Sequence, residues 1–198
     1  MDSRLRGNDN VTYLALTNTK NNTNNMLKIH ELILTFFYLG KSKKAPGTVG
    51  SIGSVALWFF LTKWFFSQEI SIANQNIFWT FFLIVIFIYG IFAIPIYAKK
   101  TEEIDHGSIV LDEVLGQVLA LQATFFFIHE DYFLQPNLIL THLFFSFVLF
   151  RFFDIKKPSV IGYCDKNFKT GFGVMLDDLL CGVVVAAIGI TIIFLKNV

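Results

Sequence analysis

The chain has 198 residues, of which 54% are hydrophobic and 24 are phenylalanine, and its mean hydropathy is +0.57. These values lie outside the usual range of soluble proteins and favour a membrane protein with a single domain. The formal net charge of +1 gives no reason to expect a nucleic-acid partner. The two cysteines, Cys164 and Cys181, fit neither a disulfide framework nor a CxxC metal motif.

Residues 1–25 differ from the rest of the chain because they are polar and rich in asparagine. Such a composition, without a sustained period, predicts a disordered tail. The segment lacks the apolar core and the cleavage site of a signal peptide, and an alternative start at Met26 is equally compatible with the sequence. Residues 26–198 are expected to form one helical domain.

Apolar segments follow one another from Met26 onward. The first, over residues 27–40, is short and semi-amphipathic, and Gly107 is expected to break a helix before a later one. Five longer segments are apolar enough to span a membrane or to pack in a core, over residues 49–66, 76–98, 109–128, 138–153 and 174–195. The pattern predicts an all-α, multi-helical membrane bundle of about five to six helices.

Basic residues are distributed asymmetrically between the connecting segments. Ten lysines and arginines lie in segments 40–48, 99–108 and 151–173, whereas segments 67–76 and 129–137 hold none. This positive-inside pattern predicts that the basic segments face the cytoplasm. The unusual polar residues lie on the same side, so the functional site is expected there too.

Two acidic pairs, Asp112–Glu113 and Asp177–Asp178, lie inside or at the mouth of apolar segments. A lone carboxylate at depth in a membrane costs at least about 2.5–3.5 kcal/mol, and adjacent like charges cost more. A divalent cation with hard oxygen ligands, Mg²⁺ first, would neutralise them. A single pair could also be a solvated helix N-terminus, where acids suit the helix dipole. Two pairs in apolar context favour a metal-dependent membrane enzyme.

Small residues follow an acid of each pair at helical spacing. Such stripes let two helices approach closely, which would bring the acids at their ends together. The two stripes are Asp112, Gly116, Ala120 and Asp178, Gly182, Ala186.

The segment over residues 41–54 begins a helix with Pro46 and carries the hydroxyls of Thr48 and Ser51. Free backbone N–H groups and the helix dipole make such a start an anion site. An ordinary helix cap followed by small-residue packing is the alternative.

Arg151, Asp154 and Lys157 are spaced to lie on roughly one side of a helix. The two cations can bind a phosphate and the acid can contribute a ligand, although a local salt bridge at the interface has the same pattern. His106 lies beside Asp105 and is a weaker candidate for a proton donor.

Four motifs in this order, PGTVGS, DHGSIVLDEVLG, FRFFDIKKPSVI and GFGVMLDDLLCG, closely resemble the phosphatidylglycerophosphatase A family over roughly residues 30–195. That family often has proline or another small residue where this chain has Ser159 and Val160. The resemblance implies Mg²⁺-dependent hydrolysis of phosphatidylglycerophosphate to phosphatidylglycerol and phosphate. It also implies a multi-pass protein of the bacterial inner (cytoplasmic) membrane with its active site on the cytoplasmic face.

Under this hypothesis the residues take three roles. The expected metal ligands are Asp112, Glu113, Asp177 and Asp178, the expected phosphate-binding residues are Thr48, Ser51, Arg151 and Lys157, and the expected catalytic residues are Asp105, His106 and Asp154. Direct attack by water and an aspartyl-phosphate intermediate both stay open. No D-x-D-x-[TV] string is present, which argues against a nucleophile of the haloacid dehalogenase type.

Two other classes of membrane protein are alternatives. A CDP-alcohol transferase would need a D-x₂-D-G run continued by later aspartates, which this chain lacks. A small ion or proton transporter also uses intramembrane acids, but usually near the midplane and with internal repeats. The sequence does not predict the oligomeric state.

Overall fold

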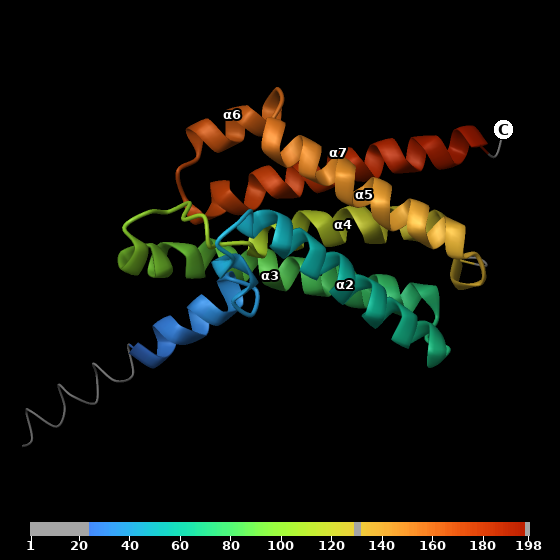
Figure 1. Cartoon of the computed structure of the whole chain (residues 1–198), viewed down its shortest axis with the longest axis horizontal. Coiled ribbons are helices and arrows are strands. Elements are labelled where there is room, and N and C mark those ends of the chain that lie inside the picture. Colours follow the sequence, from blue (N-terminus) through green and yellow to red (C-terminus); the bar gives the residue numbers. More distant parts are fainter. Residues whose placement is uncertain (1–23, 129–131, 197–198) are drawn as a thin grey trace, which may run out of the picture.

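The computed structural model describes residues 24–128 and 132–196, so residues 1–23 of the expected tail lie outside the described part. Within it, all regular structure is helical, which confirms the all-α class (Figure 1). The elements are a helix over residues 24–34, η1 (Leu39–Lys41), α2 (Pro46–Ser67), α3 (Ile72–Thr101), α4 (Leu111–Ile128), η2 (Tyr132–Leu134), α5 (Pro136–Lys156), α6 (Val160–Asn167) and α7 (Gly171–Lys196).

The predicted segments all contain a helix, but two details differ from the prediction. The first helix ends at residue 34 because Phe36, Phe37 and Tyr38 adopt positive φ angles of 43°, 56° and 68°, which leave the right-handed helical region. The short helix α6 was not predicted, since eight residues are too few to show a period. The expected break near Gly107 is confirmed, because residues 102–110 form a loop between α3 and α4.

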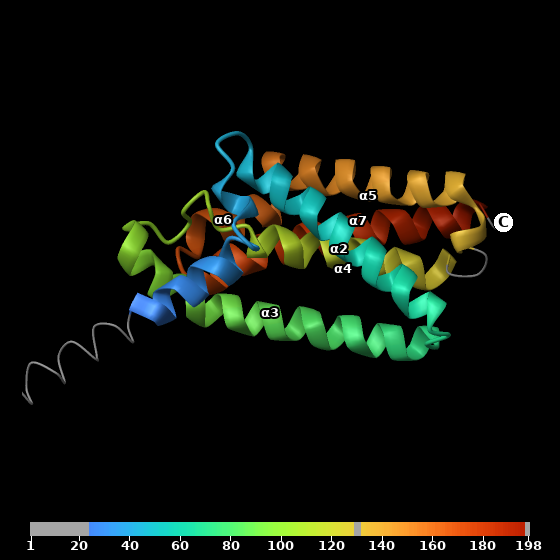
Figure 2. The same ribbon diagram turned by 60° about the horizontal axis from the view of Figure 1, so that its bottom comes forward.

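Helix α4 is the central element of the bundle. Of its membrane-length apolar window 67% is buried, against 11–33% for the windows of α2, α3, α5 and α7. In both ribbon views these four helices surround α4 (Figures 1 and 2). Leu115, Val118 and Leu121 of α4 are fully buried and form the middle of the core. Side chains at the start of α4 are therefore enclosed from several sides.

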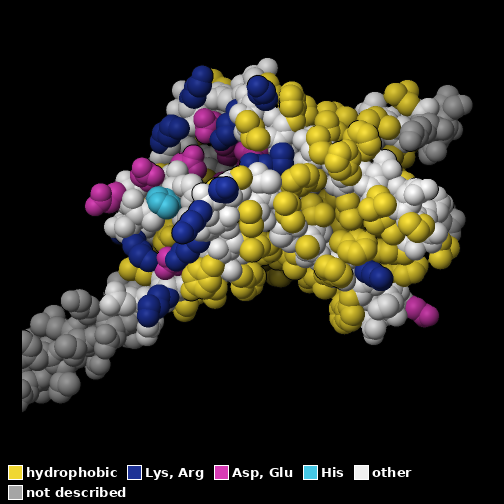
Figure 3. All heavy atoms as spheres, viewed as in Figure 1, with side chains coloured by type: hydrophobic (Ala, Val, Ile, Leu, Met, Phe, Trp, Pro, Cys, Tyr) yellow, Lys and Arg dark blue, Asp and Glu magenta, His cyan; other side chains and the backbone are white. Residues whose placement is uncertain are grey.

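The surface of the bundle is that of a membrane protein. Among the described residues, five helices (α2, α3, α4, α5 and α7) are long and apolar enough to cross a membrane. Large apolar side chains such as Phe81, Phe92 and Phe144 are more than 60% exposed, which lipid rather than water can accommodate. Charged side chains gather at the end of the molecule where α6 and the first helix lie (Figure 3).

The first helix is tied to this charged end. Glu31 forms ion pairs with Lys41 at 2.5 Å and with Lys100, at the end of α3, at 2.8 Å. The backbone N–H of Val110 donates to the carbonyl of Leu34 at 3.0 Å. These contacts hold both ends of the loop over residues 102–110, so that the loop has a fixed place beside the start of α4.

A buried polar network joins helices at the opposite end. His142 of α5 lies between the hydroxyls of Thr124 and Tyr132, with N···O distances of 2.7 and 2.8 Å. The Trp58 indole N–H donates to Gln122 Oε1 at 2.8 Å. His142 is thus a core residue whose ring nitrogens both have partners, and the network stabilises the packing of α2, α4 and α5.

Candidate active site

Three carboxylates meet where α4 and α7 cross. One oxygen each of Asp112, Glu113 and Asp178 lies within 4.8 Å of the others. Asp112 and Asp178 are only 8% and 3% exposed, and the acids come from the first turn of α4 and from α7. Asp112 Oδ1 and Glu113 Oε2 are buried without a hydrogen-bond partner. Hard carboxylate oxygens that converge and lack partners fit a divalent cation such as Mg²⁺.

Glycines explain why these acids come so close together. A Cβ atom on Gly116 would run into the backbone carbonyl of Asp178, and one on Gly182 would run into the carbonyl of Gly116. Ala120 and Ala186, further along the two helices, are also buried. The predicted contact between the two small-residue stripes is therefore present.

Asp177 lies next to this cluster in sequence but has different partners. Its carboxylate accepts a hydrogen bond from Lys157 and one, at 3.0 Å, from the backbone N–H of Asp178. The three-carboxylate group does not include it. The structure thus brings three of the four expected metal ligands together and joins the fourth to a lysine.

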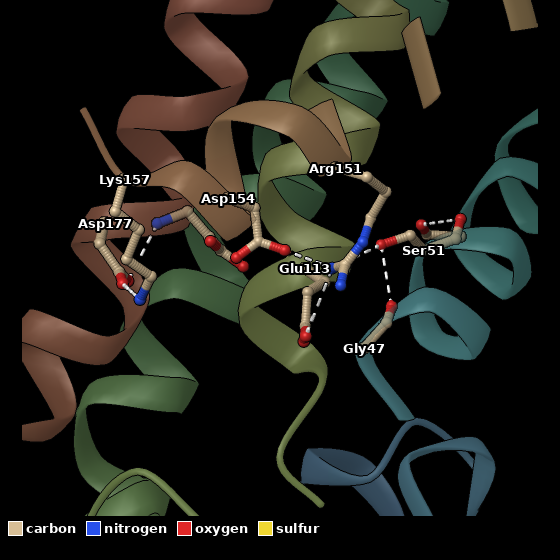
Figure 4. A network of polar contacts seen from close by, with 9 residues as sticks. Gly47, Ser51, Glu113, Arg151, Asp154, Lys157 and Asp177 are labelled. Carbon is tan, nitrogen blue, oxygen red and sulfur yellow. Dashed lines mark hydrogen bonds and ion pairs between the residues drawn. The ribbon is translucent and has the colours of Figure 1, made fainter. Parts of the chain in front are cut away.

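Arg151 connects three helices at the side of the carboxylate cluster (Figure 4). Its Nη1 forms an ion pair with Asp154 one turn further along α5, lies 3.8 Å from Glu113 Oε1, and donates to Ser51 Oγ at 3.4 Å. Its Nε is buried without a partner. The local salt bridge that the spacing allowed is present, and the guanidinium still has a donor left for another ligand.

The start of α2 approaches this arginine. Pro46 occupies the first turn, and the cap residue Ala45 offers no side-chain hydrogen bond to the first backbone N–H groups. A Cβ on Gly47 would meet the Glu113 carboxylate and would lie 3.2 Å from the Arg151 guanidinium, so a larger residue here would displace these side chains. Of the two expected hydroxyls, Ser51 contacts Arg151, whereas Thr48 lies in the same turn and is half-buried.

Lys157 lies at the other side of the cluster, just after α5, in a left-handed conformation with φ of 42°. Its Nζ bonds both Asp177 and Asp165, the latter at 2.8 Å. Burial lowers the pKa of Lys157, but the hydrogen bonds that Lys157 donates to Asp165 and Asp177 outweigh this and raise it, so the lysine is charged. The hydrogen bond from Lys157 also lowers the pKa of Asp165.

Asp165 was missed by the sequence analysis. It lies on α6, eight residues after Lys157, and no periodic pattern links the two positions. The kink at Pro158, after which α6 turns back toward α7, is what brings them together. The sequence offered one signal for it, because Asp165 is an acidic residue only eight positions after Lys157.

Asp105 and His106 lie in the loop between α3 and α4. His106 Nδ1 is 2.8 Å from Ser108 Oγ, while Asp105 is exposed and lines a surface cavity together with Asp165. Neither residue belongs to the three-carboxylate group.

Fold and site together define a helical membrane protein with buried acids, an arginine and a lysine gathered at one end of the bundle. A family profile described as Phosphatidylglycerophosphatase A matches residues 32–193, and the chain belongs to this family. It is thus a phosphatase by family, as the four motifs predicted, and neither the transporter nor the transferase alternative receives support.

Curated relatives agree with this assignment. The chain is 34% identical over 155 residues to "Phosphatidylglycerophosphatase A" of Haemophilus influenzae, with 77% of this chain and 81% of the relative covered. It is 29% identical over 160 residues to the protein of the same name from Escherichia coli, with 79% of each chain covered. A relative from Bacteroides thetaiotaomicron, provisionally named as a phosphatidylinositol-3-phosphatase, is 33% identical over 157 residues, covering 77% of this chain and 86% of the relative. No solved structure matches the chain.

Proposed function

We propose that the protein is a Mg²⁺-dependent phosphatase that hydrolyses phosphatidylglycerophosphate to phosphatidylglycerol and inorganic phosphate. The observation that carries the proposal is the group of converging carboxylates beside the partly buried Arg151, in a chain of this family. Two relatives are named for this reaction.

Asp112, Glu113 and Asp178 would hold the metal, because their oxygens converge and two of them lack hydrogen-bond partners. A bound Mg²⁺ would supply a water of lowered pKa and would offset the charge that develops on the phosphoryl group. Asp177 keeps Lys157 beside the cluster and bonds the backbone of Asp178, so it fixes the place of both.

The phosphoryl group would be bound by Arg151, Lys157 and the first turn of α2 with Thr48 and Ser51. Both cations now pair with carboxylates, and a phosphate dianion would compete for the same donors. The uncapped N–H groups at the start of α2 add a favourable dipole for an anion. The ion pair with Asp154 orients the Arg151 guanidinium.

In the net reaction the bond from phosphorus to the glycerol oxygen breaks, the oxygen of a water molecule ends on phosphorus, and the glycerol oxygen takes up a proton. Asp105, which lines a cavity together with Asp165, and its chain neighbour His106 are the candidate donors of this proton. Inorganic phosphate and the lipid alcohol are the products.

The position of the site suits a lipid substrate in the cytoplasmic leaflet of a bacterial inner membrane. The charged end carries the basic segments 40–48, 99–108 and 151–173, which favour the cytoplasmic side. The reacting phosphomonoester would then stay at headgroup level while the acyl chains remain in lipid beside the apolar helices.

The test is the release of inorganic phosphate from phosphatidylglycerophosphate by purified protein in detergent, with Mg²⁺ or with EDTA. The proposal expects release with Mg²⁺ and none with EDTA. A folded protein that releases no phosphate with Mg²⁺ or Mn²⁺ would contradict it. Detergent removes any sealed compartment, so a transporter would give no signal in this assay.

A further inference from the structure

A cavity with four charged residues in its lining lies beside the candidate active site, and the reaction proposed above uses only Asp105 of them. Its volume is about 390 Å³, within the range of small-molecule sites. It is bounded by the loop between α3 and α4, by α6 and by the start of α7. The residues that matter are Glu103, Ile104, Asp105, Asp165, Phe168 and Lys169.

Asp165 joins this cavity to the site of the phosphoryl group. Its carboxylate lines the cavity and also bonds Lys157 Nζ at 2.8 Å, and Lys157 in turn bonds Asp177 next to the metal cluster. A ligand whose phosphate contacts Lys157 would therefore lie one side chain away from the cavity, and an extension of it past Asp165 would enter the cavity.

The lining determines what such an extension can be. Three carboxylates would repel a second phosphomonoester, while they are good acceptors for hydroxyl groups. Ile104 and Phe168 offer apolar surface for methylene groups. Lys169 is the only cation among the lining residues and can pair with a single negative charge at the rim. A polar but otherwise neutral linker that ends in one anionic group fits this arrangement, whereas an acyl chain does not.

We propose that the cavity binds the headgroup glycerol and the phosphodiester of the lipid substrate. The free hydroxyl of the glycerol would donate to Asp105 or Asp165, and Lys169 would pair with the phosphodiester. The cavity then selects lipids in which a hydroxylated linker and a phosphodiester separate the phosphomonoester from the diacylglycerol. Phosphatidic acid has neither group. The inference rests on the proposed function, because it takes the phosphoryl group to bind at Arg151 and Lys157.

The first test compares kcat/KM for phosphatidylglycerophosphate and for phosphatidic acid in mixed detergent micelles. Lys169→Gln should lower kcat/KM for phosphatidylglycerophosphate about tenfold, the size expected for one hydrogen bond to a charged group. It should leave kcat/KM for phosphatidic acid unchanged. Lys166→Gln is the matched control, because Lys166 is also an exposed lysine of this segment but does not line the cavity. It should change neither value.

A second variant, Ile104→Trp, fills the cavity from the side of the loop, and its folding is checked by thermal unfolding in detergent. It should also reduce hydrolysis of phosphatidylglycerophosphate more than that of phosphatidic acid. Three results would overturn the inference while leaving a phosphatase in place. The first is an equal loss of kcat/KM for the two lipids, and the second is an equal effect of Lys169→Gln and Lys166→Gln. The third is a wild type that prefers phosphatidic acid. Absence of any release by the wild type would instead remove the proposed function itself.

Discussion

Arg151 connects residues from three helices at the site. Its guanidinium reaches Asp154, Glu113 and Ser51, which belong to three different helices. A planar fork of donors can serve several oxygens at once, whereas the ammonium of lysine is a point charge on a flexible stem. The residue is therefore expected to position the substrate and to join α2, α4 and α5 at their charged ends.

Arg151→Lys is expected to lower kcat for phosphatidylglycerophosphate about 10²-fold, the loss typical of removing one placed donor at a reacting anion. Steady-state kinetics in detergent measure this. Lys156→Gln, at the exposed neighbouring lysine on the same helix, is the control and should behave like the wild type. Full activity of Arg151→Lys would show that only the charge at this position matters.

At the scale of the helices, the crossing of α4 and α7 positions the acids. This part of the site could be predicted, because the spacing of Asp112 with Gly116 and of Asp178 with Gly182 is visible in the sequence and directly implies a close helix contact. The partner of Lys157 could not be predicted, since Asp165 reaches it only through the turn after α5 and the short helix α6. A contact of this kind depends on backbone angles such as the positive φ of Lys157.

Gly116→Ala is expected to destabilise the protein by about 1–3 kcal/mol, because the added Cβ would collide with the backbone carbonyl of Asp178 and the helices must separate. Thermal unfolding in detergent measures the loss, and activity should fall with it as Asp178 moves away from Asp112. Gly107→Ala is the control, since a Cβ there meets nothing within 4 Å. If both variants unfold at the same temperature as the wild type, the crossing is not tightly packed.

The first helix is held to the bundle by an ion-pair cluster whose contribution depends on pH. Hydrogen bonds from Lys100 and Lys41 lower the pKa of Glu31 below its ordinary value. A carboxylate with a lowered pKa stabilises the fold above its unfolded pKa of about 4.3, and this contribution is lost as the pH falls through the folded value.

The stability difference between the wild type and Glu31→Gln is therefore expected to be present at neutral pH and to vanish in acid. Unfolding temperatures in detergent between pH 3 and pH 8 measure this difference. It should also shrink at high salt, because both lysines are partly exposed and their charges are screened. A difference that is independent of pH would mean that Glu31 acts through packing alone.

The molecule has an apolar body, and most of its charged side chains lie at one end (Figure 3). The helical class, the membrane-length segments and the side on which the polar motifs gather followed from hydropathy and from the distribution of lysine and arginine. The central place of α4 did not, because the hydropathy of its apolar window is 1.4, the same as that of α2, so hydropathy alone does not single it out.

The orientation across the membrane can be tested with single cysteines in a variant that lacks Cys164 and Cys181. A membrane-impermeant maleimide applied to spheroplasts should label Asn74→Cys, at the end opposite the charged site. It should label Lys43→Cys only after lysis. Both positions are exposed, so labelling reports the side of the membrane rather than burial. The reverse pattern would contradict a cytoplasmic site.

We propose that Asp112, Glu113 and Asp178 form a divalent-metal site. Direct binding of Mn²⁺ to the purified protein is the best test of this site. Mn²⁺ is a paramagnetic substitute for Mg²⁺ that also accepts oxygen ligands, so bound and free ion can be distinguished by electron paramagnetic resonance. Glu69→Gln removes an exposed acid at the opposite end and is the control. We expect the wild type and Glu69→Gln to bind Mn²⁺ equally well and Asp178→Asn to bind it at least about tenfold more weakly. Equal affinity in all three proteins, or no binding by the wild type, would contradict the account.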